Sequence, residues 1–295
     1  MKNGTCWLDT GGKPIQAHGG CIISYNDRYY WYGENKGVKT EDRRIDFAGF
    51  SCYSSADMHA WVNEGVVLAA VRESEHELHP DNVGERPKVL YNEKTRKFVM
   101  LFHLDKRRYD YARVGVAVAS NPTGPFEYSG SLRPAGRDSR DMYVFRDDDG
   151  AAYLICSSDW NSTTLICALN DSYTNLGGTV KSAFVEQYRE AQVLVKEKDR
   201  YYMFSSGCTG WEPNSMLYAV SNAPMGGWKL VDNPCSGPNY RKTFGGQTAN
   251  AFWLDDKWYI MLDHWNPTDL GSSGYSFLPI HIDGDYVEIK WVEEF

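Results

Sequence analysis

The stretch Ile22-Ile23-Ser24-Tyr25-Asn26-Asp27-Arg28-Tyr29-Tyr30-Trp31-Tyr32 joins two short apolar and aromatic runs through a polar turn. Such runs, separated by Asn, Asp, Gly or Lys, are typical of β-hairpins. The pattern is repeated along the chain, whereas long helical periodicity is almost absent. The other four copies are Val89–Phe102, Val144–Cys156, Val193–Phe204 and Phe252–Met261.

A second hairpin follows each of these first hairpins. Two hairpins supply four strands per repeat, and five repeats fill the 295 residues. The sequence therefore predicts an all-β fold, a five-bladed β-propeller with four-stranded antiparallel blades around a central channel. It forms one domain over residues 1–295. A β-sandwich is excluded because it has about half as many strands and no such repeat. The first turns recur every 50 to 66 residues, at Asn26, Asn92, Asp147, Glu197 and Asp255.

Charge and composition exclude several classes of partner. The net charge of −8 and pI near 5.4 do not suit nucleic acid or an anionic membrane, and the short basic run 106–108 is interpreted as a solvated loop. No apolar run approaches the ~20 residues of a membrane span. The 10 Trp and 20 Tyr residues suit core packing and also stacking on sugar rings. We therefore expect a saccharide partner, without nucleic acid or membrane; the sequence gives no indication of the oligomeric state.

The ends and the cysteines bear on localisation. The N-terminal residues 1–7 lack the apolar core of a signal peptide, which predicts a cytoplasmic protein, or a secreted or periplasmic one whose leader has been removed. The seven cysteines show no CxxC pair and no zinc spacing, so neither a disulfide framework, a metal site nor a cofactor is predicted.

Polar residues stand where the first strand of each repeat begins. Because these strands line the channel of a propeller, their first residues should converge near the axis. Three of the five are carboxylic acids, and like charges at close range resist simultaneous ionisation. Such a site can raise one carboxyl pKa and hold another down, as glycoside hydrolysis requires. The five residues are His18, Glu85, Asp141, Glu190 and Gln247.

The alternative interpretation of these acids is a purely structural, salt-bridged lining of the channel. Arg86, Arg140 and Arg189 each stand next to one of the acids in the sequence and are expected to compensate their charge. Under this interpretation the acids would have no catalytic role.

Motifs at and near the strand starts carry a family resemblance. The chain resembles glycoside hydrolase family 43, and within it the exo-β-1,3-galactanase branch. The resemblance implies a five-bladed propeller and hydrolysis with inversion at the anomeric carbon. The matching segments are Ile15–Gly20, Tyr30–Glu34, Glu85–Val89, Arg140–Met142, Arg189–Ala191, Ser206–Asn214 and Gly246–Gln247.

The resemblance implies roles for four catalytic residues. Glu190 corresponds to the general acid, and Asp141 to the carboxylate that raises its pKa and orients it. The Asp that activates water in most of the family is missing from residues 16–20. In the galactanase branch a Gln corresponding to Gln247 has the water-positioning role, and Glu85 is the alternative base.

Other matching positions are implied to bind the terminal galactose: Glu34, Arg86, Asn161, Thr209 and Trp211. For Asn161 a turn role is the alternative, since it lies in 159–162, whereas the glycines around Trp211 place that ring in a loop. Residues 263–265 end a strand and are further candidates. His103 is expected to be a hydrogen-bonded structural histidine.

Three functions compete. The first is an exo-acting enzyme that releases galactose from β-1,3-galactan, such as the arabinogalactan backbone. The second is an α-L-arabinofuranosidase or β-xylosidase of the same family, which needs an Asp in the first blade, where only Asp9 is nearby. The third is a catalytically inactive galactan-binding propeller, favoured by the missing base.

Overall fold

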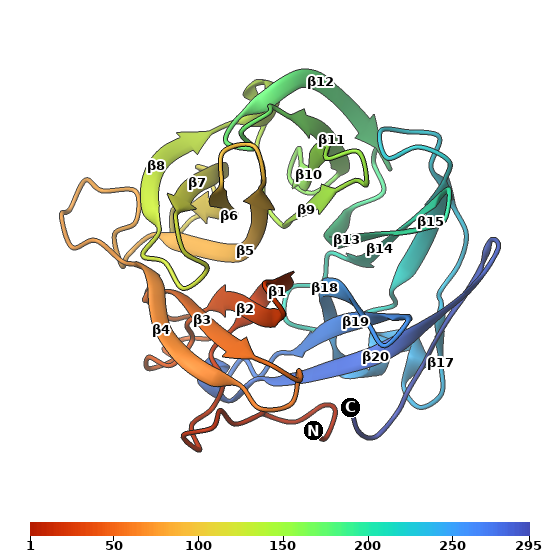
Figure 1. Ribbon diagram of the computed structural model, residues 1–295, viewed down its shortest axis with the longest axis horizontal. Coiled ribbons are helices and arrows are strands. Elements are labelled where there is room, and N and C mark those ends of the chain that lie inside the picture. Colours follow the sequence, from red (N-terminus) through yellow and green to blue (C-terminus); the bar gives the residue numbers. More distant parts are fainter.

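The computed structural model describes residues 1–295, which form five antiparallel sheets arranged in a ring (Figure 1). This confirms the predicted five-bladed propeller. The first blade consists of β1 (His18–Tyr25), β2 (Arg28–Glu34), β3 (Gly49–Ser55) and β4 (Val62–Ala69). The second consists of β5 (Val83–Asn92), β6 (Lys97–Asp105), β7 (Arg113–Ala119) and β8 (Glu127–Leu132). The third is β9 (Met142–Arg146), β10 (Ala152–Ser158), β11 (Thr163–Leu169) and β12 (Leu176–Ala183), and the fourth β13 (Arg189–Glu197), β14 (Arg200–Gly207), β15 (Leu217–Ser221) and β16 (Lys229–Leu230).

The fifth blade departs slightly from the expected pattern. It comprises β18 (Gln247–Leu254), β19 (Lys257–His264), β20 (Gly274–Asp283) and β21 (Tyr286–Lys290), with an additional edge strand, β17 (Cys235–Ser236), parallel to β21. The only helices are short 3-10 turns, so no helix is long and apolar enough to span a membrane. They are η1 (Pro134–Gly136), η2 (Tyr240–Gly245) and η3 (Leu270–Ser272).

Polar hairpin turns set the register of the blades. In the first blade Asn26 and Asp27 both have positive φ, and Tyr25 pairs with Arg28. This is the two-residue hairpin geometry whose twist matches that of the strands, and residues with short polar side chains tolerate it. The same geometry recurs at residues 255–256 between β18 and β19.

The hydrophobic core lies between neighbouring blades and not at the axis. Trp31 and Trp61 are fully buried and meet edge to face at 5.2 Å within one such cluster. Most of the surplus aromatic residues therefore have a packing role, as the composition allowed. The axis is left to the polar ends of the inner strands.

The two chain ends meet and close the ring (Figure 1). The Met1 amine donates to the carbonyl of Phe295 at 2.7 Å, and a bridge joins Lys2 to Glu294. The N-terminal segment thus packs against the fifth blade without adding a strand to its sheet. This closure holds the first and fifth blades, and so the two sides of the channel, in a fixed relation.

Candidate active site

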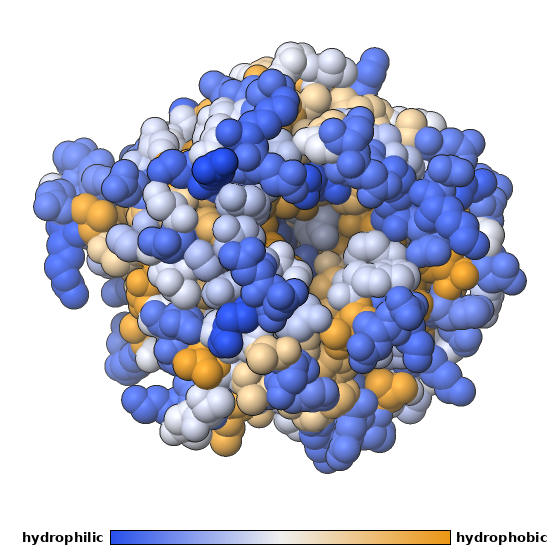
Figure 2. Space-filling view, viewed as in Figure 1, coloured by the Kyte–Doolittle hydropathy of each residue, from blue (hydrophilic) through white to orange (hydrophobic).

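In each blade the inner strand comes first in chain order among the four main strands. These inner strands are β1, β5, β9, β13 and β18; the short edge strand β17 precedes β18 in the chain but lies at the outer side of the fifth sheet. Figure 2 shows a face that is hollowed at the centre of the ring. A cavity of about 910 Å³ lies where the inner strands begin. Eight of the nine predicted site residues line it: Glu34, Glu85, Arg86, Asp141, Asn161, Glu190, Trp211 and Gln247.

A shared backbone device presents the inner-strand residues. The ladder register shifts directly after the residue predicted at the channel in three blades, His18, Glu85 and Glu190, which marks a β-bulge. Bulges re-aim side chains, and the next residue here adopts left-handed φ. Glu85 and Glu190 thereby project into the cavity. The three left-handed residues are Gly19 (φ 57°), Arg86 (φ 53°) and Ala191 (φ 53°).

Glu190 has the properties of a carboxylic acid held in its neutral form. Burial, reinforced by the charge of Asp141, raises the pKa of Glu190 to about 8, although Arg86 acts in the opposite direction. The amide of Gln247 donates to one of its oxygens at 3.0 Å, and Asn161 donates to the other at 3.3 Å. These two contacts fix the direction of the carboxyl group.

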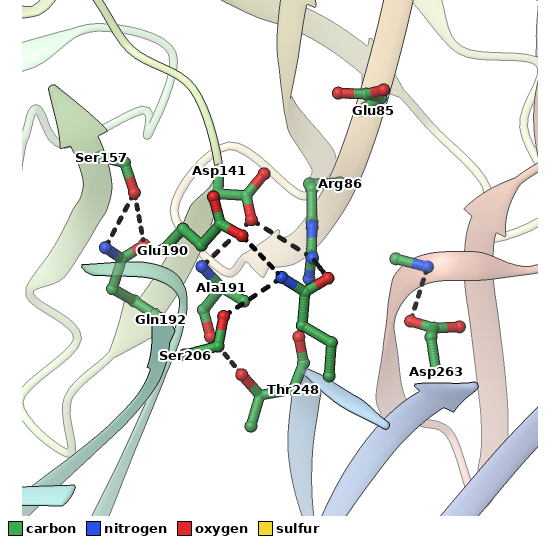
Figure 3. A network of polar contacts seen from close by, with 12 residues as sticks. Glu85, Arg86, Asp141, Ser157, Glu190, Ala191, Gln192, Ser206, Thr248 and Asp263 are labelled. Atoms are coloured by element: carbon green, nitrogen blue, oxygen red, sulfur yellow. Dashed lines mark hydrogen bonds and ion pairs between the residues drawn. The ribbon is translucent and has the colours of Figure 1, made fainter. Parts of the chain in front are cut away.

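Asp141 is held beside Glu190 by two contacts. Its Oδ2 accepts from the backbone N–H of Ala191 at 3.1 Å and lies 3.2 Å from the guanidinium of Arg86. Ala191 follows Glu190 directly, so the bulge of β13 ties the two carboxyl groups together. Figure 3 shows Asp141, Glu190 and Arg86 close to one another, with Glu85 apart.

Only one of the three neighbouring arginines compensates the acids. Arg86 pairs with Asp141, the acid of the next blade, and not with Glu85, its neighbour in sequence. Arg140 instead pairs with Asp138, so the expectation for this residue is wrong.

The expectation for Arg189 is also wrong. Its guanidinium bonds to the hydroxyl and carbonyl of Ser205, away from the acids. Successive strand residues point to opposite sides, which separates an arginine from its adjacent acid.

Gln247 is hydrogen-bonded through its whole amide group. Its oxygen accepts from Arg86 at 2.6 Å and from the indole of Trp265 at 3.0 Å. Its nitrogen donates to Glu190 and to Ser206. An amide oxygen has two lone pairs, so both are occupied here.

Glu85 belongs to a separate network on the same cavity wall. Its oxygens contact His103 at 3.1 Å and the hydroxyl of Tyr109 at 2.8 Å. Burial alone would raise the pKa of Glu85, but these contacts and the charges of His103 and Lys36 outweigh it and lower the pKa to about 2.

His103 is buried and bonded through both ring nitrogens, to Glu85 and Asp105, as a structural histidine should be. Burial opposes its protonation, but the two carboxylates prevail and raise its pKa to about 9.

The first blade contributes a residue to the cavity from its second strand, β2, and not from its inner strand, β1. His18, the first residue of β1, does not line the cavity: it is fully buried and stacks on Tyr275 at 4.8 Å. Its expected place is taken by Glu34, which pairs with β1 opposite His18. Glu34 forms a buried ion pair with Lys36 at 2.5 Å and accepts from the Arg86 N–H at 3.0 Å.

Of the three loop residues predicted to bind galactose, Asn161 and Trp211 line the cavity and Thr209 does not. Asn161 is both a turn residue, with φ 64°, and a wall residue whose buried Oδ1 has no partner. Trp211 lies in a loop and meets Trp265 edge to face at 5.5 Å. Thr209 does not line the cavity, because its hydroxyl is used within its own loop by Glu212 and Asn214.

Of the candidates 263–265 only Trp265 reaches the cavity, while Asp263 is fully buried and accepts from the Gly19 N–H at 2.9 Å. Other wall residues were not anticipated, among them Tyr109 and Lys36. Lys36 stands two residues after Glu34, which is a signal for an ion pair, but the loop that carries Tyr109 has no such pattern. Arg43 and Arg44 also line the cavity, and their loop likewise has no sequence pattern that would have predicted this.

Glu190, a carboxyl with a raised pKa, lies beside the second carboxyl of Asp141 in the channel of a five-bladed propeller, and such a pair of acids is typical of a glycoside hydrolase. The family model "Glycosyl hydrolases family 43" matches residues 13–277. The chain belongs to this family. No curated protein matches it.

Solved structures of the family are closely similar. A GH43 β-1,3-galactosidase with galactodeoxynojirimycin is 34% identical, with a TM-score of 0.94, over 100% of this chain and 99% of that one. The exo-β-1,3-galactanase from Phanerochaete chrysosporium, solved with β-1,3-galactotriose, is 34% identical with a TM-score of 0.91, over 98% and 66%. That from Clostridium thermocellum is 34% identical with a TM-score of 0.88, over 99% and 65%. The chain thus spans about two thirds of each galactanase.

Proposed function

We propose that the protein is an exo-β-1,3-galactanase, which releases galactose from the non-reducing end of β-1,3-galactan with inversion of configuration. The observation that carries the proposal is Glu190, a carboxyl with a pKa raised to about 8 directly beside Asp141. The similar solved structures of a β-1,3-galactosidase and of two exo-β-1,3-galactanases support the choice of sugar and linkage.

The blocked channel supports exo action. Arg86, which lines the cavity, donates to the carbonyl of Thr248 at 2.6 Å, and Lys88, two residues further along the same inner strand, donates to that of Gly19 at 2.6 Å. Both cationic side chains are buried, so a polysaccharide has no passage along the axis. A cavity closed at one end accepts a chain terminus, not an internal segment.

In the proposed reaction Glu190 protonates the glycosidic oxygen as the bond to the anomeric carbon breaks. Asp141 acts through Glu190, because its negative charge favours the protonated acid. The leaving sugar departs with the proton of Glu190. Water attacks the anomeric carbon from the opposite face, gives up a proton to the base, and the product is α-galactose.

Glu85 is favoured over Gln247 as the base. It is ionised, and two donors leave part of its acceptor capacity free for a water molecule. The oxygen of Gln247 has both lone pairs occupied, and its amide is neutral. In this arrangement Gln247 orients Glu190 and Arg86. If Glu85 is the base, azide, which enters the space left by the carboxylate and attacks the anomeric carbon without a base, should restore turnover of an activated galactoside to E85A but not to Q247A.

The remaining alternatives lack support from the geometry. Asp9, the acid that an arabinofuranosidase or xylosidase needs in the first blade, accepts from the N–H groups of Gly11 and Lys13 and holds a turn. It does not line the cavity. An inactive binding propeller gives no account of the raised pKa of Glu190.

Incubation with β-1,3-galactotriose tests the proposal. The wild type should release galactose one unit at a time, and NMR should detect the α anomer first. E190Q should slow this reaction by about 10²- to 10⁴-fold, but should retain turnover of 2,4-dinitrophenyl β-galactoside, whose leaving group needs no proton. E75Q, at an exposed glutamate outside the cavity, is the control. Near-normal hydrolysis of the trisaccharide by E190Q contradicts the assignment.

A further inference from the structure

The cationic groups of the cavity are not all balanced by acids. Four of them have carboxylate partners: Lys36 pairs with Glu34, Arg86 with Asp141, Arg140 with Asp138, and His103 with Glu85 and Asp105. Arg43 and Arg44 also line the cavity, yet neither forms a salt bridge with any carboxylate of the protein. In a chain of net charge −8, two unpaired guanidinium groups at a sugar site require an explanation.

Arg44 is held in place at the wall. Its guanidinium donates to the carbonyl of Arg107 at 2.9 Å and lies over the ring of Tyr109, 5.9 Å from its centre. Tyr109 in turn bonds to Glu85. Arg43 and Arg44 are presented by a tight turn in which Glu41 and Arg44 exchange two backbone hydrogen bonds.

The surface beyond the cavity continues the same chemistry. Arg44 also lines an adjoining cleft of about 590 Å³, together with Arg43 and Trp211, and then an outer groove of about 1190 Å³. In the outer groove Glu41 is already paired with Lys39, and Asp46 with Arg107. Arg44 and Arg72 are left there without a carboxylate partner.

A neutral galactan offers only hydroxyl groups, for which a free guanidinium is not required. Arginine binds planar anions through two parallel N–H donors, and carboxylates are its best-matched partners. We propose that the cleft and outer groove bind an anionic substituent on the substrate, the carboxylate of a uronic acid carried as a branch by the terminal, non-reducing galactose. This inference rests on the proposed function and names its substrate class more narrowly.

The position of the arginines fixes where the acid must be. The cleft that carries Arg43 and Arg44 shares Glu34, Glu85 and Trp211 with the cavity, but Glu190 and Asp141 do not line it. The leaving sugar lies on the side of the acid, Glu190, so the cleft adjoins the terminal galactose and not the leaving group. The uronate should therefore be a branch on the terminal galactose, and should be released together with that galactose.

Three trisaccharides test the inference: β-1,3-galactotriose with a 1,6-linked glucuronic acid on the terminal, non-reducing unit, the same compound with its carboxyl reduced to the alcohol, and galactotriose sulfated at that position. At low salt the uronate compound should have a kcat/KM about tenfold above its reduced counterpart. The difference should lie in KM and should decrease with added NaCl, since exposed ion pairs are screened. Equal kcat/KM for the two compounds overturns the inference.

Variants locate the effect. In R43Q/R44Q the ratio of kcat/KM for the uronate and reduced compounds should fall to about one, whereas R108Q, at an exposed arginine outside the cavity and grooves, should keep the wild-type ratio. A preference that survives in R43Q/R44Q contradicts the site. A preference for the sulfated compound alone overturns the assignment to a carboxylate.

Titration calorimetry with E190Q separates this inference from the proposed function. If the wild-type enzyme releases no galactose from the neutral trisaccharide, the proposed function is wrong. The calorimeter still reports whether the uronate compound binds more tightly than its reduced counterpart, and whether R43Q/R44Q removes that difference.

Discussion

Replacement of Asp141 by Asn removes the charge that helps to keep Glu190 protonated. Glu190 acts as an acid only below its pKa of about 8, so the alkaline limb of kcat should lie near pH 8 in the wild type. A neighbouring opposite charge shifts a carboxyl pKa by about 1 to 3 units, and we take a like charge to shift it upward by a similar amount. Arg86, which contacts Asp141 at 3.2 Å, would then act on Glu190 alone.

The alkaline limb of D141N should therefore move down by about 1 to 2 pH units, a change of about 1.4 to 2.7 kcal/mol in the ionisation of Glu190. At pH 8 kcat should fall by about tenfold more than at pH 5, because far less of the acid remains protonated. The assay is the rate of galactose release from β-1,3-galactotriose from pH 4 to 10. D110N, at an exposed residue outside the cavity, controls for net charge. A D141N limb that stays near pH 8 refutes the electrostatic role of Asp141.

Three further outcomes follow from buried contacts. Burial lowers the pKa of Lys88 to about 8, against about 10.4 in the unfolded chain. The unfolded chain therefore binds more protons between these values, and the free energy of unfolding of the wild type should rise by about 2 kcal/mol between pH 7 and 9.5 relative to that of K88M. The same pH dependence of unfolding by urea in the two proteins would contradict this. G19A places a Cβ against the carboxylate of Glu34 at φ 57° and should lower the free energy of unfolding by at least about 1–2 kcal/mol; an unchanged melting temperature would show that the bulge relaxes. W265F removes the indole bond to Gln247 and should lower kcat roughly tenfold, whereas an effect confined to KM would assign Trp265 to sugar binding alone.

The repeat pattern was sufficient to predict the architecture. Polar turns such as Asn26-Asp27 specify hairpins locally, and a fixed repeat length then determines how many blades close the ring. The same periodicity located Glu85, Asp141 and Glu190 at the ends of inner strands, because strand order within a blade is sequential. Each of these predictions depends only on spacing along the chain.

The ion pairs could not be predicted in this way. Arg86 stands beside Glu85 but binds Asp141, more than fifty residues away in sequence, and Arg140 stands beside Asp141 but binds Asp138. The bulge is equally hidden, since Arg86 and Ala191 carry no residue-type signal for positive φ. Side-chain direction after a bulge is decided by the neighbouring blade.

Arg86 shows why structural and catalytic requirements are not separable at this site. Its backbone and guanidinium contact Glu34, Asp141, Gln247 and Thr248, which come from the first, third and fifth blades. A buried guanidinium is costly unless it is paired, and these partners offset the cost. The same cation also limits how far the pKa of Glu190 can rise. A purely structural channel lining would have neutralised both acids. Here a single cation pairs with Asp141 and leaves Glu190 without a salt bridge, and that asymmetry assigns the proton to Glu190.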